Sequence, residues 1–348
     1  MIKLKNLTVD ELYTSLNTIG VTPTIAAKLQ AAAIRSDTWL SGGSGISPRL
    51  LERVRENATI PRLTISGKFV SPKDGFARYI FRGEGPEAFE AVRIPLRRRV
   101  TVPKFVVCVS SQVGCAIGCS FCYTGRMGFK RQLETWEIID QVIRVMTDSP
   151  YPIGGIVFMG MGEPLLNYES VMRAARILSE SCGMAISPKS ITISTAGIVP
   201  AIKRFIAEKP RINLIVSLSS ADPIQRRLLM PIEEMYSVHS LMQTLREYHA
   251  VTGNRVNLAW PMISGVNTRP VDATQIADLT HGLPIRLELI DVNDETGRFK
   301  PPSEHEMSEF RDALRANGVK PVTRRYSGGQ DIHAACGMLA GNFHTIED

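Results

Sequence analysis

Three cysteines within eight residues could bind an inorganic cluster. Cys115, Cys119 and Cys122 form a CxxxCxxC run inside residues 114–125. A four-iron four-sulfur cluster usually takes one cysteine per iron, so three cysteines leave one iron open to a small chelating molecule. The alternative is a structural zinc site, which normally needs four ligands in paired spacings, and no second pair is present in this sequence. The spacing therefore predicts a cluster rather than zinc.

The open iron predicts S-adenosylmethionine (SAM) as a second cofactor, bound to the cluster through its amino and carboxylate groups. An electron passed from the cluster into the sulfonium breaks a carbon–sulfur bond and releases a 5'-deoxyadenosyl radical. In such chemistry the cofactors carry the difficult step, and the protein supplies binding and orientation. The cysteine loop therefore predicts a radical enzyme that depends on an electron donor such as flavodoxin or ferredoxin.

Two further cysteines could act as reactive thiols. Cys336 lies in the run 334–338, where small neighbours allow close approach of the backbone, and Cys108 precedes the cysteine loop by seven residues. On a loop that reaches the active site, a thiolate can act as a nucleophile. The alternative for each residue is a buried, inert thiol that behaves as a small hydrophobe. The residues alone leave both interpretations open.

The elements that must position these residues alternate between apolar strands and amphipathic helices after Val102. We expect strands at 105–109, 155–159, 190–194, 212–218, 256–262 and 286–292. Helices fit between them, for example at 135–146, 168–180 and 238–251. Six such units predict an α/β fold built on a partial parallel (βα)6 barrel, with a doubly wound sheet as the alternative.

Two smaller regions precede this barrel. Residues 1–60 place apolar side chains at helical spacing and predict a small helical accessory domain. Residues 61–100 contain short alternating runs separated by Gly, Pro and Asp, which predict a small β extension. Residues 101–348 would then form the barrel, with Cys336 on a C-terminal loop.

Polar and glycine-rich residues fall where four of the predicted strands end. Residues 160–164 follow the second strand, Ser194 ends the third, residues 217–219 end the fourth and Asn293 follows the sixth. Active sites of βα barrels form at the carboxyl ends of the strands, so one cofactor could contact all four places. Glu163 is well placed there to accept a charge-assisted hydrogen bond from the SAM ammonium.

The bulk composition indicates a cytoplasmic protein with a polyanionic partner. The 348 residues are 44% hydrophobic and carry a formal net charge of +7, with arginine clusters at 97–99, 226–227 and 324–325. Each cluster alone is typical of a solvated face, but their sum favours a polyanionic partner. Three of the six cysteines are crowded into one loop, which favours a metal site in a reducing compartment. No long apolar run predicts a membrane span, and we expect a monomer.

Three segments together resemble one family, the radical SAM adenosine methyltransferases of RNA known as RlmN and Cfr. They are Val107-Cys-Val-Ser-Ser-Gln-Val-Gly-Cys-Ala-Ile-Gly-Cys-Ser-Phe-Cys122, Phe158-Met-Gly-Met-Gly-Glu-Pro-Leu-Leu-Asn167 and Asp331-Ile-His-Ala-Ala-Cys-Gly337. The resemblance runs in order from about residue 89 to the end, with a weaker echo in the helical N-terminal region. Gly162-Glu-Pro164 is closer to the RlmN branch, since the Cfr branch has Gly-Glu-Ala there.

The resemblance implies a mechanism that uses two SAM molecules per turnover. The first methylates Cys336, and the second, bound at the cluster, gives the radical that takes a hydrogen from the S-methyl group. The resulting methylene radical adds to an adenine ring carbon, and Cys108 then forms a disulfide with Cys336 to release the methylated base. Glu90 matches the family's proton acceptor. The implied SAM contacts are Gly162, Glu163, Ser194, Ser217, Leu218, Ser219 and Asn293.

The implied reaction is methylation of carbon 2 of an adenosine in 23S ribosomal RNA, with transfer RNA as a further candidate substrate. Several positions depart from the family pattern, among them Ser219, where the family usually has His, residues 258–264, residues 289–294, and Met338 in place of Gln. One alternative is therefore a paralogue with the same radical chemistry on adenine carbon 8, a peptide or a small molecule. Another is a metal-bearing RNA-binding protein without catalysis. Without the resemblance, Glu90 would be a surface carboxylate paired with Arg93 or Arg97.

Overall fold

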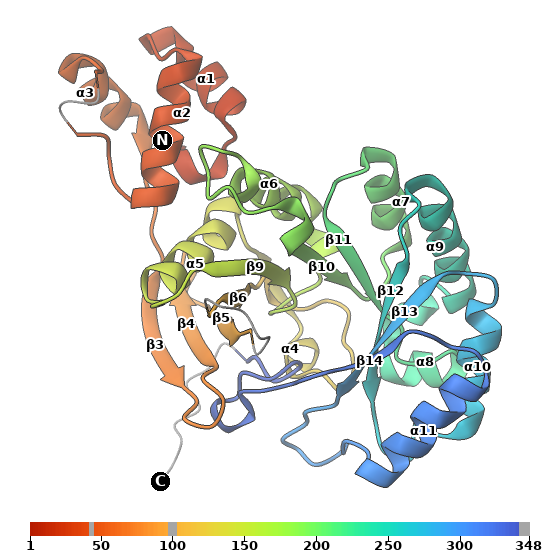
Figure 1. Cartoon of the computed structure of the whole chain (residues 1–348). Helices are drawn as coiled ribbons and strands as arrows, with labels where there is room; N and C mark the ends of the chain where they lie inside the picture. The colour runs from red at the N-terminus through yellow and green to blue at the C-terminus, as the bar shows by residue number, and fades with distance from the viewer. Residues whose placement is uncertain (42–44, 97–102, 341–348) are drawn as a thin grey trace.

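One sheet of ten strands forms the body of the molecule (Figure 1). We analysed a computed structural model of the chain, which describes residues 1–41, 45–96 and 103–340. Seven neighbouring strands of the sheet run parallel. They are β6 (Phe105–Cys108), β9 (Ile153–Phe158), β10 (Ile191–Thr195), β11 (Asn213–Ser217), β12 (Val256–Met262), β13 (Ile285–Asp291) and β14 (Val322–Arg325).

The predicted partial barrel is confirmed, and the doubly wound alternative is wrong. The parallel strands follow one another in chain order across the sheet, whereas a doubly wound sheet reverses its order at a switch point. All six predicted strands are present, with ends that differ by at most two residues. The prediction missed β14, because its sequence Val-Thr-Arg-Arg has no apolar alternation and it forms one edge of the sheet.

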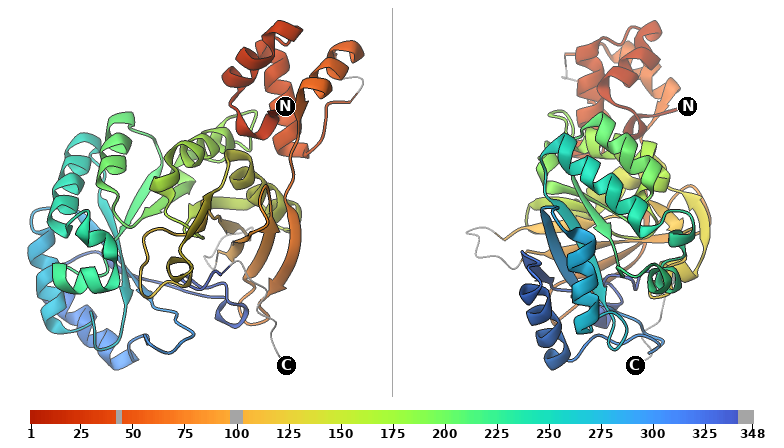
Figure 2. Two further views of the ribbon diagram at one scale, coloured as in Figure 1. Left: turned by 180° about the vertical axis from the view of Figure 1, so that it is seen from behind. Right: turned by 90° about the vertical axis from the view of Figure 1, so that its right-hand side faces the viewer.

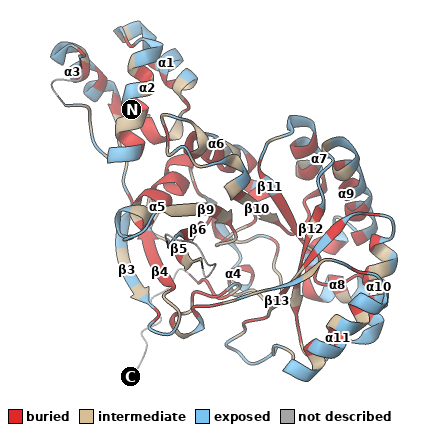
Figure 3. Cartoon of the chain, viewed as in Figure 1, coloured by how far each residue is buried: buried red, intermediate tan, exposed pale blue. Residues whose placement is uncertain are grey.

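Helices cover the outer face of the parallel strands (Figure 2). They are α5 (Thr135–Thr147), α6 (Tyr168–Ser179), α7 (Val199–Glu208), α8 (Pro223–Leu229), α9 (Val238–Thr252), α10 (Pro270–Thr280) and α11 (Glu304–Ala316). The three predicted helices correspond to α5, α6 and α9. In each of the three helices one face is buried against the sheet and the opposite face is exposed, as Figure 3 shows, and the buried positions are mainly apolar. The inner strands of the parallel part are mainly buried, whereas the edge strand β14 is not.

Three antiparallel strands continue the same sheet on the other side of β6. These strands, β3 (Thr64–Val70), β4 (Ala77–Arg82) and β5 (Ala88–Pro95), are the ones expected in the β extension. Val92 pairs with both Cys108 and Arg78, and Glu90 pairs with Ile80. Residues opposite each other across neighbouring strands share a face, and so do residues two apart along a strand. The side chains of Arg78, Glu90 and Cys108 are therefore on one face of the sheet.

A small helical unit at the N-terminus has its own apolar core. It contains α1 (Val9–Leu16), α2 (Pro23–Ala31) and α3 (Pro48–Asn57), with β1 (Ile2–Lys3) paired to β2 (Ala58–Thr59). A capping box at Thr8 and a threonine cap before Pro23 begin the first two helices. The fully buried ammonium of Lys5 binds Asp37 at 2.7 Å and Asp140 of α5 at 2.5 Å. This ion pair attaches the unit to the barrel.

Two short strands and a short helix frame the cysteine loop. Strands β7 (Gln112–Gly114) and β8 (Phe129–Gln132) pair with each other, and α4 (Tyr123–Arg126) begins after Cys122. The three cysteines therefore lie on a bend whose two ends are fixed. No helix among the described residues is both long and apolar enough to cross a membrane.

Candidate active site

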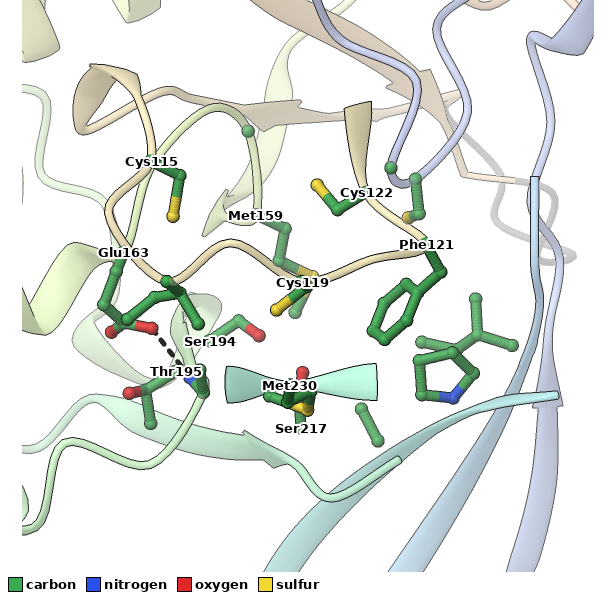
Figure 4. A pocket seen from close by; sticks show the side chains of 18 of the residues that line it. Cys115, Cys119, Phe121, Cys122, Met159, Glu163, Ser194, Thr195, Ser217 and Met230 are labelled. Carbon is green, nitrogen blue, oxygen red and sulfur yellow. Dashed lines mark hydrogen bonds between the residues drawn. The ribbon is translucent and has the colours of Figure 1, made fainter. Parts of the chain in front are cut away.

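A cavity opens at the carboxyl ends of the parallel strands, between the cysteine loop and the C-terminal loop (Figure 4). Its lining brings together nine of the residues predicted from sequence, which come from segments spread over more than 200 positions of the chain. They are Cys115, Cys119, Cys122, Gly162, Glu163, Ser194, Ser217, Asn293 and Cys336. The site therefore lies at the end of the barrel where the strand polarity predicts it.

Glycines allow the cysteine loop to pack closely against its neighbours. A Cβ on Gly125 of α4 would lie 2.9 Å from the backbone nitrogen of Cys119. Gly114 has φ +70°, and a Cβ there would lie 1.8 Å from the carbonyl oxygen of Gly128. The Cys115 N–H donates to that same carbonyl oxygen at 3.2 Å, and the Cys122 N–H donates to the Cys119 carbonyl at 3.1 Å. Backbone contacts thus fix the positions of all three thiols.

The three thiols form a donor set that suits a cluster with one open iron. Burial raises the pKa of Cys115 to about 12 and raises the pKa values of Cys119 and Cys122 as well. Because metal–sulfur bonds need thiolates, binding of a cluster must release these protons. Within the described residues no three His, Cys, Asp or Glu side chains come together around a single ion. A cubane does not require this, since each of its irons takes one cysteine.

The segment Gly162-Glu163 is held in place by β7 and by the end of β10. The Glu163 N–H donates to Gln112 Oε1 at 2.8 Å, and a Cβ on Gly162 would lie 2.5 Å from the Gln112 Cβ. Glu163 Oε2 accepts from the Ala196 N–H at 2.7 Å (Figure 4), and Oε1 accepts from the Leu165 N–H at 3.0 Å. Burial raises the pKa of this carboxyl to about 7, although these hydrogen bonds oppose the rise. The site therefore holds a desolvated carboxylate that a cation would stabilise.

Two of the residues that the resemblance implies as SAM contacts do not line the cavity. Leu218 is part of the apolar core. Ser219 is fully buried with φ +60°, and its carbonyl oxygen accepts from Asn267 Nδ2 at 2.8 Å. Its hydroxyl makes no hydrogen bond to any described residue. Their contact with SAM stays a prediction from the resemblance.

Asn293 connects the end of β13 to the loop that carries Cys336. Its Nδ2 donates to the Ser327 hydroxyl at 2.8 Å and to the Cys336 carbonyl at 3.2 Å, and its Oδ1 accepts from Gln330 Nε2 at 2.7 Å. The sequence prediction gave Asn293 a contact with SAM alone. The structure adds a role in holding the C-terminal loop.

Cys108 and Cys336 are free thiols that lie near each other. Cys336 is exposed at the cavity, while Cys108 is buried at the end of β6. Burial and, to a smaller extent, the neighbouring Cys336 together raise the pKa of Cys108 to about 12, although the charge of Arg325 opposes the rise. The C-terminal loop also contacts α4, because the Tyr123 N–H donates to the Gly337 carbonyl at 2.7 Å. The structure therefore places Cys336 in the cavity lining beside the cysteine loop, whereas Cys108 lies near Cys336 but does not itself line the cavity.

Glu90 is buried, so its interpretation as a surface carboxylate is wrong. Glu90 Oε1 lies 3.5 Å from the guanidinium of Arg78, and both side chains are 0% exposed. Arg93 instead approaches Asp148 at 3.9 Å, and Arg97 lies outside the described residues. Since Glu90 and Cys108 share a face of the sheet, β5 directs this carboxylate toward the same side as the Cys108 thiol.

Arg325 is a cavity residue that the sequence did not single out for the site. Its Nη1 lies 2.8 Å from Met159 Sδ, and its Nη2 binds Glu288 Oε2 at 2.5 Å. The sequence signal was the pair 324–325, which is also what an exposed basic patch would show. The structure places Arg325 in the cavity lining, close enough to Cys108 for its charge to act on that thiol.

The described arginines of the other clusters form ion pairs with carboxylates. Arg226 is fully buried, binds Glu233 and donates to the Ala196 carbonyl at 3.0 Å. Arg227 pairs with Glu234 at 2.7 Å, and Arg324 pairs with Asp291 at 2.7 Å. The cluster 97–99 lies outside the described residues. Arg226 therefore has a structural role, and no free basic patch is formed by the pairs 226–227 and 324–325.

Comparisons with known proteins agree with this geometry. Residues 109–275 match the radical SAM superfamily, whose members use a four-iron four-sulfur cluster and SAM. A probable RNA methyltransferase of Anaeromyxobacter sp. (strain Fw109-5) is 46% identical over 92% of this chain and 94% of its own. The dual-specificity RNA methyltransferase RlmN of Syntrophobacter fumaroxidans is 42% identical over 78% of each chain.

A solved structure extends the likeness to the whole fold. The crystal structure of a radical SAM methyltransferase from Sphaerobacter thermophilus superposes with a TM-score of 0.89 at 34% identity. It covers 98% of this chain and 100% of that chain. The chain thus belongs to the radical SAM RNA methyltransferase family that includes RlmN, and it is an enzyme of that family.

Proposed function

We propose that the protein methylates carbon 2 of an adenosine in 23S ribosomal RNA, with Cys336 as the methyl carrier. The observation that carries this proposal is the meeting of Cys336 with the cysteine loop in one cavity, with Cys108 nearby. The relatives named RlmN are described as dual-specificity RNA methyltransferases, which supports transfer RNA as a further substrate. We further propose a cytoplasmic monomer that is reduced by flavodoxin or ferredoxin.

The residues around the cavity divide into those that hold cofactors and those that handle the methyl group. Cys115, Cys119 and Cys122 would ligate the cluster, and Glu163 would accept a hydrogen bond from the SAM ammonium. When bound, the cluster and SAM supply the one-electron cleavage that an unreactive ring carbon requires. Three further lining residues are proposed to contact SAM: Gly162, Ser194 and Ser217.

Cys336 would accept the methyl group because it is the exposed thiol at the cavity. Cys108 would later attack the Cys336 sulfur, so that a disulfide forms while the bond between that sulfur and the methylene carbon breaks. The carbon keeps the electron pair and takes up a proton, which gives the methylated base. Burial keeps the Cys108 thiol neutral, but only the thiolate can attack. The positive charge of Arg325 would favour that thiolate. Glu90 would accept the proton lost from the base, and Arg78 compensates a carboxylate that is costly to bury alone.

Methyl transfer by cysteine variants tests the proposal. Anaerobic enzyme with cluster, SAM, reductant and 23S ribosomal RNA is expected to yield 2-methyladenosine in a nucleoside digest measured by mass spectrometry. Cys336→Ala should still release 5'-deoxyadenosine slowly but transfer no methyl group, and Cys108→Ala should accumulate a covalent protein–RNA adduct.

A matched control is Cys182→Ala, because Cys182 is a half-buried thiol remote from the cavity that contacts Gln30 at 3.0 Å. This variant should transfer methyl groups like the unmodified enzyme. Methyl transfer by Cys336→Ala would refute the carrier role. The same digest separates the second candidate, because 8-methyladenosine in place of 2-methyladenosine would indicate the carbon 8 paralogue suggested by Ser219 and residues 289–294.

A further inference from the structure

The two ends of the ten-stranded sheet meet without forming a strand ladder. Strands β3 and β14 are the edge strands, so the barrel stays open between them. The turn between β3 and β4 lies beside the segment that follows β14, as both Figure 1 and Figure 2 show. We call the contact between residues 71–76 and residues 326–331 the seam.

Asp74 makes the central contacts of the seam. Its Oδ2 accepts from the Gly329 N–H at 2.8 Å and from the Tyr326 hydroxyl at 3.1 Å. Ser71 donates from its hydroxyl to Asp331 at 3.0 Å. The rings of Phe76 and Tyr326 pack edge to face with centroids 6.2 Å apart. One carboxylate thus joins two segments that are about 250 residues apart in the sequence.

Local structure prepares this carboxylate for its contacts. Asp74 Oδ1 accepts from the Phe76 N–H at 3.2 Å, and the Asp74 N–H donates to the Ser71 hydroxyl at 3.3 Å. Burial alone would raise the pKa of Asp74, but the hydrogen bonds, led by that from the Gly329 N–H, lower its pKa below the usual value. A Cβ on Gly328 would lie 2.5 Å from Asp74 Oδ2. Glycine is therefore required where the loop meets the carboxylate.

A continuous path of hydrogen bonds connects the seam to Cys336. The Gly329 carbonyl accepts from the Ala334 N–H at 2.8 Å, which closes the turn around the short helix η7 (Gln330–Ile332). Gln330 donates to Asn293, and Asn293 donates to the Cys336 carbonyl at 3.2 Å. The position of the thiol therefore depends on where Asp74 holds the beginning of this loop.

We propose that Asp74 is a positioning residue that closes the open side of the barrel and thereby holds Cys336 at the cavity. The proposal deepens the role assigned to Cys336 and rests on it for its functional consequence. Without the carboxylate, the C-terminal loop loses the two hydrogen bonds that hold residues 326–329. The remaining contacts, with Ser71, Phe76, Asn293 and α4, no longer keep the loop in place, and it samples positions away from the cavity. SAM cleavage then continues while methyl transfer fails, so the two reactions become uncoupled.

Hydrogen–deuterium exchange of the cluster-loaded protein tests the placement without any RNA. Peptides that cover residues 326–339 should exchange about tenfold faster in Asp74→Ala, which loses both inter-segment hydrogen bonds from the carboxylate. Asp74→Asn keeps one acceptor oxygen and Tyr326→Phe keeps the ring contact, so each should show a smaller increase. Asp312→Ala is the matched control, since that exposed carboxylate contacts only Arg315 among its described neighbours and should leave the exchange unchanged.

The functional readout is the ratio of 5'-deoxyadenosine to methylated nucleoside. It should rise in Asp74→Ala, rise less in Asp74→Asn and stay constant in Asp312→Ala. Unchanged exchange of residues 326–339 in Asp74→Ala would overturn the proposal whatever the RNA activity. If Asp74→Ala fails to fold, unchanged exchange in Tyr326→Phe has the same meaning. Absence of methylated RNA from the unmodified enzyme would instead refute the proposed function. The exchange measurement would still test whether Asp74 holds the C-terminal loop.

Discussion

Gly125 shows how little space separates the cysteine loop from α4. A methyl group at this position would lie 2.9 Å and 3.0 Å from the nitrogen and oxygen of Cys119, both of which are backbone atoms that cannot rotate away. We expect Gly125→Ala to lower the free energy of unfolding by about 1–3 kcal/mol and to reduce the iron bound per chain. Iron and sulfide assays with thermal denaturation measure both effects.

Gly128→Ala is the control for this prediction. Unlike Gly125, Gly128 has a positive φ of +67°, but its Cβ would meet no atom within 4 Å. The Gly128→Ala substitution should therefore lower the free energy of unfolding only by the backbone penalty of about 1 kcal/mol, and the variant should keep its iron. A Gly125→Ala protein with full iron content would contradict the steric explanation.

The raised pKa of Glu163 predicts that the free energy of unfolding of the cluster-free protein depends on pH. Its pKa is about 7 in the fold against an ordinary value of 4.5, because burial disfavours the charged form. Between these values the folded chain binds more protons than the unfolded chain, so the free energy of unfolding falls as the pH rises through this window. Above pH 7 the free energy of unfolding is about 3 kcal/mol lower than it would be if Glu163 had its ordinary pKa.

Glu163→Gln removes the titrating group and should flatten the curve. The difference in unfolding free energy between variant and unmodified protein is expected to grow from pH 4.5 to pH 7 and then stay constant. Denaturant titrations at several pH values measure it. Parallel curves for the two proteins would show that Glu163 has an ordinary pKa.

Residues with local signals were predictable, and those defined by distant partners were not. The three cysteines and Gly162-Glu163 were found because their chemistry follows from a short spacing and a strand end. Arg226 and Arg325 were taken for members of basic clusters, since the carboxylates that bind them, Glu233 and Glu288, are brought close only by the fold. Burial of a charge depends on tertiary contacts that no local pattern contains.

The strands followed the same rule. The six parallel strands were predicted because each contains several apolar residues, either in a run, as in β6, or in alternation, as in β10 and β13. Strand β14 was missed because it is an edge strand with two arginines. The alternation in residues 63–94 predicted strands correctly, but not that β5 would pair with β6 and extend the barrel wall. Strand pairing is a long-range property, so the joint position of Glu90 and Cys108 could not be read from the sequence.

The attachment of the N-terminal helices to the barrel depends on a buried charge. Lys5 is fully buried against Asp140, whose other oxygen accepts from the Leu63 N–H at 2.7 Å. We expect Lys5→Met to lower the free energy of unfolding by about 3 kcal/mol, because it leaves a buried carboxylate with fewer compensating contacts. Chemical denaturation measures this loss.

Lys3 provides the comparison for the same measurement. Its ammonium binds Glu84 and Glu134 but is partly exposed, so Lys3→Met should cost at most about 1 kcal/mol. The double variant Lys5→Met/Asp140→Asn should recover part of the loss, because the amide still accepts from Leu63 and carries no charge. Equal losses for Lys5→Met and Lys3→Met would show that the buried ion pair contributes no more to the free energy of unfolding than the partly exposed one.

The contact between α4 and the C-terminal loop has a consequence for the intact molecule. Tyr123 and Thr124 donate to the carbonyls of Gly337 and Leu339, at 2.7 Å and 2.6 Å, directly after the last cysteine of the cluster loop. Oxygen damage that removes the iron and loosens α4 would also release the segment that bears Cys336, the proposed methyl acceptor. A chain that has lost its cluster is therefore expected to lose SAM cleavage and methyl transfer together, so it does not consume SAM without methylating RNA.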